Sequence, residues 1–121
     1  MKKPSLKKFM IRNYEKLPGS KEFPYHKLIL ITAAGMICGM PVDEDEDREK
    51  EEIGTLFQQN HESYQKYRRE NDIPEHQTLP GNDGYIMLKD VSIMANNQIT
   101  RLNSMVVFCD EVIGVTIGMM E

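Results

Sequence analysis

Residues 27–40 read KLILITAAGMICGM, and this stretch decides the fold that we expect. Its first part, KLILIT, is apolar and rich in β-branched residues, a composition typical of a buried strand. Ala34-Gly35 supplies a turn, because glycine accepts the positive φ that tight hairpins need. The chain returns over residues 36–40, where Gly39 indicates a bulge or a sharp bend. The stretch therefore predicts a β-hairpin whose second strand is bent.

The last third of the sequence is also rich in strand-forming residues. Residues 85–94 form one predicted strand, which ends at an Asn96-Asn97 turn. The segments after it are a short one at 99–102, a turn at Asn103-Ser104, and strands at 105–109 and 112–117. This pattern favours a strongly bent antiparallel sheet or small barrel of five strands. We expect the last two strands to be its edges. Neither contains the proline or lysine that commonly blocks edge pairing, so pairing with another subunit is favoured.

Two helices are predicted around these strands. Ser5 can cap a helix over residues 6–17, in which the helically spaced apolar residues are Leu6, Phe9, Met10, Tyr14 and Leu17. The first interpretation is a docking helix with a solvated basic face. The alternative is a helix that presents its lysines to phosphate or to an acidic protein.

A long second helix is expected from about residue 44 to residue 69, because acidic residues favour the positive end of the helix dipole. Its apolar stripe comprises Ile53, Leu56, Phe57, Tyr64 and Tyr67. His61 lies on that stripe, which favours a packing role over a ligand role. We therefore predict one α+β domain over residues 1–121, with a basic N-terminal helix in 1–20. A helical insertion and loop in 43–84 separates strands two and three.

The composition bounds the class of protein. Hydrophobic residues make up 40% of the 121 residues and charged residues 28%, which is ordinary for one globular domain. The longest apolar stretch, residues 28–42, is too short and too interrupted to span a bilayer. No apolar run of the signal-peptide type directly follows the basic N-terminus. The expectation is a cytoplasmic protein with no membrane partner.

The sequence offers little support for catalysis. It contains no G-x-S-x-G, no P-loop and no dinucleotide-binding fingerprint. Residues 43–47 resemble the start of a calcium loop, but Arg48 and Gly54 stand where that loop needs glycine and glutamate. His26, His61 and His76 lack partners at metal-ligand spacing. We expect no enzyme activity, no cofactor and no metal.

The two cysteines, Cys38 and Cys109, both lie in apolar segments of strand character. They have no CxxC or Cys/His spacing around them. Buried reduced thiols are the first interpretation, and a disulfide or redox pair is the alternative.

The net charge of −4 conceals an asymmetry. Residues 1–21 carry seven Lys/Arg and one acid, whereas residues 43–52 carry eight acids. This balance argues against a uniformly nucleic-acid-binding surface and leaves a local basic patch at the N-terminus. The candidate binding residues on that helix are Lys7, Lys8 and Arg12.

Three segments together resemble the Sm-like (LSm) family of proteins. They are the hairpin at 28–39, the strand at 85–91, and VVFCDEVI at 106–113. Members of that family have an N-terminal helix and a highly bent five-stranded barrel, and they assemble into rings. The resemblance implies a small Sm-like β-barrel with a long helix inserted between strands two and three. It also implies a homo-oligomer, with a ring or a dimer as the two forms considered and a monomer as the alternative.

The sequence departs from the Sm-like family where that family holds a nucleobase. The loop that carries the family's Asp and Asn is replaced by the long helical insertion, and Tyr85 stands roughly where the Asn would fall. The family's Arg-Gly is replaced by Cys109-Asp110, whose carboxylate would repel phosphate. Tyr85 and Arg101 complete the candidate binding residues. Nucleic-acid binding is expected to be weak.

A second resemblance is to gas-vesicle accessory proteins of the U type, through the stretch IMLK at residues 86–89. The function that we predict is a non-enzymatic oligomeric interaction or scaffolding module with an Sm-like barrel. Its partner would be itself or another protein. The alternatives are an RNA, nucleic-acid or small-ligand binding protein and, further, a gas-vesicle accessory protein.

Overall fold

The computed structural model describes residues 5–43, 51–73 and 84–119. The chain forms two compact units, one from residues 1–42 and 83–121 and the other from residues 43–82. Within the described residues, the first unit contains helix α1 and a five-stranded antiparallel sheet, and the second contains helix α3. The predicted α+β class is therefore confirmed, and the second unit coincides closely with the predicted insertion.

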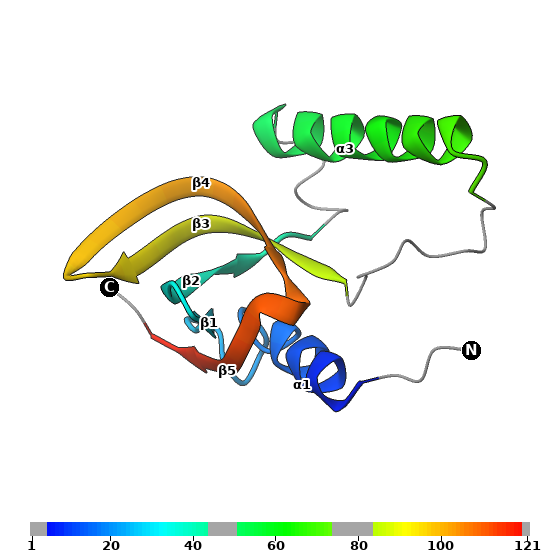
Figure 1. Cartoon of the computed structure of the whole chain (residues 1–121). Helices are drawn as coiled ribbons and strands as arrows, with labels where there is room; N and C mark the ends of the chain where they lie inside the picture. Colours follow the sequence, from blue (N-terminus) through cyan, green and yellow to red (C-terminus); the bar gives the residue numbers. More distant parts are fainter. Residues whose placement is uncertain (1–4, 44–50, 74–83, 120–121) are drawn as a thin grey trace. The chain divides into compact units, whose positions relative to one another are not determined.

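The sheet has the strand order β4-β3-β2-β1-β5, with antiparallel neighbours throughout (Figure 1). Its strands are β1 (Lys27–Thr32), β2 (Gly35–Pro41), β3 (Tyr85–Ala95), β4 (Gln98–Phe108) and β5 (Val112–Gly118). The predicted hairpin is thus confirmed, as is the strand that ends at Asn96 and Asn97, both of which adopt positive φ. The sheet is not closed into a barrel, because β4 and β5 are its two ends.

One predicted turn is wrong. Asn103 and Ser104 do not interrupt the chain but lie inside β4, a single strand of 11 residues. Ser104 is paired with Lys89 and Leu102 with Val91 of the equally long β3. Ladder pairing with a long neighbouring strand therefore outweighs the local turn preference of Asn and Ser.

The bend predicted at Gly39 is confirmed. Cys38 pairs with Ser92 and Met40 with Lys89, so β3 carries one extra residue opposite β2. Asp90 lies in that interval and has φ 52°. A Cβ on Gly39 would lie 3.1 Å from the carbonyl oxygen of Lys89. A residue with a side chain would fit there only if a neighbour moved, so the close approach of the two strands favours glycine. The bulge lets β2 and β3 bend together.

The core lies between the sheet and α1. Its buried members are Ile11, Leu28, Leu30, Ile37, Ile86, Leu88, Val91, Val107, Cys109 and Val112. The strand members come from all five strands and from η1 (Cys109–Glu111), the short 3-10 helix that joins β4 to β5. The α1 member is Ile11, with Tyr14 packed beside the cluster.

Helix α1 (Leu6–Glu15) begins as predicted, because the Ser5 hydroxyl accepts a hydrogen bond of 3.0 Å from the N–H of Lys8. Its buried face is different from the predicted one. Ile11 is 1% exposed, whereas Leu6 is 75% and Phe9 58% exposed. Polar contacts from Lys7 and Arg12, which flank Ile11 on the helix, hold the Ile11 face against the sheet, as described below.

Helix α3 (Glu51–Glu70) has 20 residues, which is more than five turns, and follows β2 in the chain as predicted. The expected start at residues 44–50 lies outside the described residues. Ile53 is buried, but Tyr64 and Tyr67 are exposed, so the apolar stripe is not buried along its whole length. His61 is exposed too, and its predicted packing role is wrong. None of the described helices is long and apolar enough to cross a membrane.

Candidate functional site

The basic residues of α1 meet the backbone of the sheet at one corner. Lys7 Nζ donates a hydrogen bond of 3.1 Å to the carbonyl oxygen of Asp110 in η1. Arg12 Nη2 donates one of 3.1 Å to the carbonyl oxygen of Tyr85 at the start of β3. Arg12 Nη1 also contacts both carboxylate oxygens of Glu15, at 3.1 and 3.0 Å. These cations therefore fasten the helix to two strand ends, which explains why the Ile11 face is the buried one.

Lys8 and Arg12 converge above Gly84, which precedes β3. Gly84 has φ +89°, and a Cβ there would lie 3.0 Å from Arg12 Nη2 and 3.5 Å from Lys8 Nζ. Four of the five predicted binding residues are therefore brought together at this corner. The fifth, Arg101, pairs with Ser92 in the far half of the β3–β4 hairpin. The end of β4 at Phe108 is seven positions farther along the chain, about 23 Å in an extended strand.

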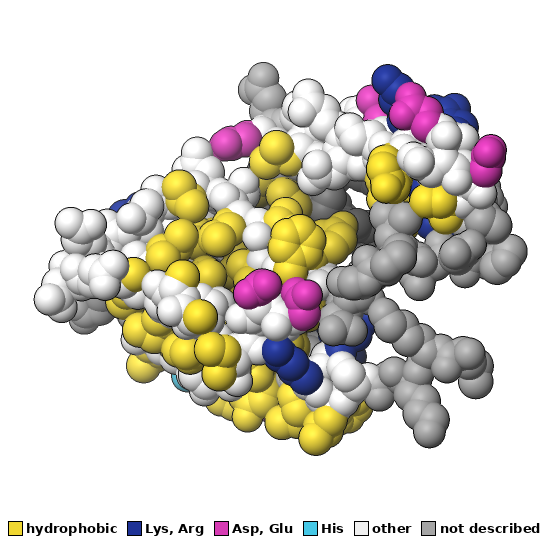
Figure 2. Space-filling model, viewed as in Figure 1, with side chains coloured by type: hydrophobic (Ala, Val, Ile, Leu, Met, Phe, Trp, Pro, Cys, Tyr) yellow, Lys and Arg dark blue, Asp and Glu magenta, His cyan; other side chains and the backbone are white. Residues whose placement is uncertain are grey.

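The two sheet edges form the larger exposed feature. β4 and β5 end the sheet, as predicted, and among the described strands each has a neighbour on one side only. β5 reads VIGVTIG and has no charged residue or proline. Apolar side chains that are at least two-fifths exposed lie along both strands, namely Ile99, Leu102, Phe108 and Ile113. Figure 2 shows hydrophobic side chains exposed over this part of the molecule.

The outward face of α1 is a second apolar surface. Leu6, Phe9 and Met10, the last 40% exposed, share one side of the helix. The sequence pattern predicted that these residues dock the helix together with Tyr14 and Leu17; of this set Tyr14 does pack against the core, and Ile11 was missed. The only sequence signal for the true orientation is that Ile11 and Tyr14, three residues apart, form a narrower apolar face flanked by Lys7 and Arg12.

Both cysteines are buried thiols outside any disulfide, each 1% exposed. Burial raises the pKa of the Cys38 thiol, and the charge of Lys27 opposes that rise. The first interpretation of the cysteines agrees with this arrangement, since a neutral buried thiol is a poor nucleophile.

Among the described residues, no three His, Cys, Asp or Glu side chains gather in a way that could hold a metal ion. The acidic run at 43–47 lies outside this description except for Asp43. His26, just before β1, packs edge-on against Phe23 with ring centroids 5.0 Å apart. Its Nδ1 is buried and has no hydrogen-bond partner among the described residues.

Comparisons with protein-family models, with curated proteins and with solved structures find no match to this chain.

Proposed function

We propose that this chain is a non-enzymatic scaffolding module that assembles with itself by pairing the β5 edge of one copy with the β4 edge of the next. The observation that carries the proposal is the pair of open edges at the two ends of one bent sheet. Neither edge carries a proline or lysine, the residues that most often prevent such pairing.

Edge pairing satisfies backbone groups that otherwise depend on water. An added strand supplies main-chain hydrogen bonds along the edge, and the flanking side chains become buried. On β5 the most exposed apolar side chain is Ile113, at 71%. On β4 the corresponding side chains include Ile99, at 60%, and Phe108, at 59%. Burial of these side chains adds an apolar contribution to the backbone pairing.

A contact between two different edges has a defined symmetry. Because β4 and β5 are different surfaces, the contact is heterologous and leads to a ring when the rotation between copies closes. The resemblance to Sm-like proteins supports the same proposal, since an N-terminal helix and five bent strands are expected for that family, although here α3 is inserted between β2 and β3.

Light scattering at micromolar concentration tests the proposal. We expect a mass that is a multiple of the 14.0 kDa of one chain. Thr116→Lys and Ile113→Lys place a charge on exposed positions of β5 and should reduce that mass to 14.0 kDa. Ala34→Lys is the matched control, since it adds the same charge in the exposed β1–β2 turn.

A wild-type mass of 14.0 kDa would overturn the proposal, and so would an oligomer that survives both β5 variants. Circular dichroism should show that the variants remain folded. Val107 is unsuitable for this purpose although it lies in β4, because it is only 4% exposed and belongs to the core.

A further inference from the structure

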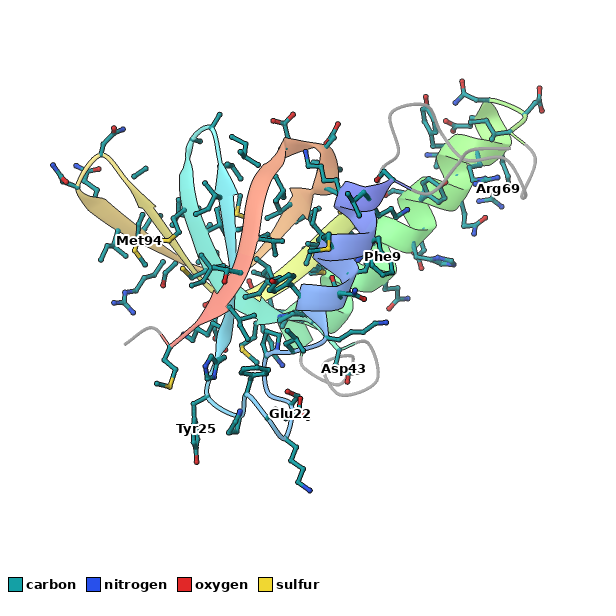
Figure 3. All side chains as sticks on the ribbon, turned by 90° about the horizontal axis from the view of Figure 1, so that it is seen from below. Phe9, Glu22, Tyr25, Asp43, Arg69 and Met94 are labelled. Atoms are coloured by element: carbon teal, nitrogen blue, oxygen red, sulfur yellow. The ribbon has the colours of Figure 1, made fainter. Side chains whose placement is uncertain are left out.

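Three sulfur-containing side chains lie on the face of the sheet that points away from the core. Successive residues of a strand point to opposite faces, and Ile37 of β2 belongs to the core cluster. Its neighbours Met36 and Cys38 therefore lie on the other face. Met94 is the ladder partner of Met36 on β3, and it shares that face because the preceding Ile93 packs against the core. Figure 3 labels Met94 near the end of β3.

Met36, Cys38 and Met94, which we call the sulfur patch, are close neighbours in the ladder. Met36 and Met94 are directly opposite each other, which places their Cβ atoms about 5 Å apart. Cys38 is two residues from Met36, about 7 Å along the strand. Its own ladder partners are Ile29 of β1 and Ser92 of β3, neither of which carries a charge. Cys38 is 1% exposed and both methionines are half-buried, so the patch is apolar and rich in sulfur.

The ligands that the sulfur patch offers are soft. Thiolate and thioether sulfurs favour Cu(I) over harder cations. A Cu(I) ion held by one thiolate and two neutral thioethers forms a site with no net charge, which is less costly to bury than a charged one. Zn²⁺ at the same ligands would keep a positive charge and would have three protein ligands instead of four. We propose that Met36, Cys38 and Met94 bind one Cu(I) ion. The Cys38 thiol releases its proton to solvent as the copper–sulfur bond forms, and no atom changes oxidation state.

The methionines also give the ion a route to the buried thiol. A methionine side chain is unbranched and has three rotatable bonds, so its sulfur can swing towards a neighbouring group. Because Met36 and Met94 are half-buried, an ion from solvent meets their sulfurs first and then passes to Cys38. Burial raises the pKa of the Cys38 thiol, but the charge of Lys27 opposes that rise and favours the thiolate that copper needs.

Competition with a chelator tests the site. Under anaerobic conditions, Cu(I) is supplied as its coloured complex with bicinchoninate, and transfer to the protein removes the colour. We expect the wild type to take up one Cu(I) per chain. Cys38→Ala should abolish the transfer, and Met36→Leu or Met94→Leu should each weaken the affinity roughly 10- to 100-fold. Methionine and leucine have similar volumes, so these variants should keep the fold, which circular dichroism checks.

Two further variants are matched controls. Met40 also lies on β2, but its Cε is 3.5 Å from where a Cβ on Gly19 would stand, so its side chain reaches towards the loop before β1. Met40→Leu therefore makes the same chemical change on the same strand and should leave the affinity unchanged. Cys109→Ala removes the other buried thiol, which belongs to the core cluster, and should also leave the affinity unchanged.

Methyl NMR identifies the ligands directly. Ag(I), a redox-inert substitute for Cu(I), should shift the methyl resonances of Met36 and Met94 and leave that of Met40 in place. The sulfur patch lies on the inner strands β2 and β3, so Thr116→Lys, which tests edge pairing, should not change the copper uptake. Failure of edge pairing and failure of copper binding are therefore distinguishable.

Retention of all the copper by the chelator would overturn the proposal. Transfer that survives Cys38→Ala would overturn the assignment to this patch. Equal losses of affinity in Met36→Leu and Met40→Leu would show that Met36 has no special part in binding. Displacement of the bound Cu(I) by an equimolar amount of Zn²⁺ would overturn the assignment to a soft monovalent ion.

Discussion

Gly35 lies directly against the backbone of Met94. A Cβ on Gly35 would stand 2.6 Å from the carbonyl oxygen of Met94 and 2.9 Å from the Cβ of Ala95, and the φ of Gly35 is +145°. We expect Gly35→Ala to lower the free energy of unfolding by about 2 kcal/mol or more, because both the φ and the contact penalise a side chain. Denaturant unfolding followed by circular dichroism measures this change.

Gly114→Ala is the matched control for this position. Gly114 also lies in a strand, but an added Cβ would meet only Ile31 at an ordinary 3.6 Å. We expect its free energy of unfolding to stay within about 0.5 kcal/mol of the wild type. Equal losses in the two variants would show that the close approach of Gly35 to Met94 is not the cause.

Asp90 occupies the bulge of β3 with φ 52°, in the left-handed region. Asp and Asn tolerate this conformation better than β-branched residues, whose Cβ crowds the neighbouring carbonyl group. We expect Asp90→Asn to be nearly neutral and Asp90→Val to lower the free energy of unfolding by about 2 kcal/mol. An unaffected Asp90→Val protein would contradict the bulge at this residue.

The orientation of α1 is tested by two truncations on opposite faces. Ile11→Ala should lower the free energy of unfolding by about 2–4 kcal/mol, because it leaves a cavity beneath a side chain that is 1% exposed. Phe9→Ala should change the stability of the isolated chain by no more than about 0.5 kcal/mol. Thermal melts at low protein concentration give both values. The reverse order of effects would restore the face that the sequence pattern suggested.

The outcome for α1 shows where sequence patterns stop being informative. Periodicity identified the helix and the Ser5 cap correctly, since both depend on residues close together in the chain. It did not identify the buried face. That choice depends on hydrogen bonds from Lys7 to Asp110 and from Arg12 to Tyr85, which join residues far apart in sequence.

In the sheet, too, local features were predictable from the sequence and long-range ones were not. The hairpins and the bulge at Gly39 were predictable because turns and bulges have local residue requirements. The continuity of β4 through Asn103 and Ser104 was not, because it results from pairing with β3. The two open edges could be predicted from the sequence. The proximity of Lys7, Lys8, Arg12 and Tyr85 could not, because it depends on how α1 packs on the sheet.

The buried thiols give a prediction about reactivity. Because burial raises the pKa of the Cys38 thiol, the neutral thiol is the form that the folded state favours. We expect both cysteines to react with a thiol reagent at pH 7 only when the chain is unfolded. The contribution of Cys38 to stability should be present at neutral pH and decline as the pH rises above about 8.5, where an unfolded thiol ionises. Rapid reaction of the folded protein would contradict this burial.

The cations of α1 are only partly available to bind nucleic acid. Lys7 and Arg12 already donate hydrogen bonds to the fold, and Arg12 forms an ion pair with Glu15. We therefore expect weak, sequence-independent affinity for single-stranded RNA or DNA that falls steeply between about 50 and 200 mM salt. Fluorescence anisotropy with a labelled oligonucleotide measures it.

Two double variants locate any such binding. Replacing Lys7 and Lys8 by Ser should reduce the affinity, whereas replacing the exposed Lys66 and Arg69 of α3 by Ser should not. Each double variant removes two positive charges, so the net charge of the chain is matched. If binding persists at about 200 mM salt and survives loss of the α1 lysines, nucleic acid is held by contacts other than exposed cations. A binding pocket elsewhere in the chain would then replace the self-assembling scaffold as the main functional hypothesis.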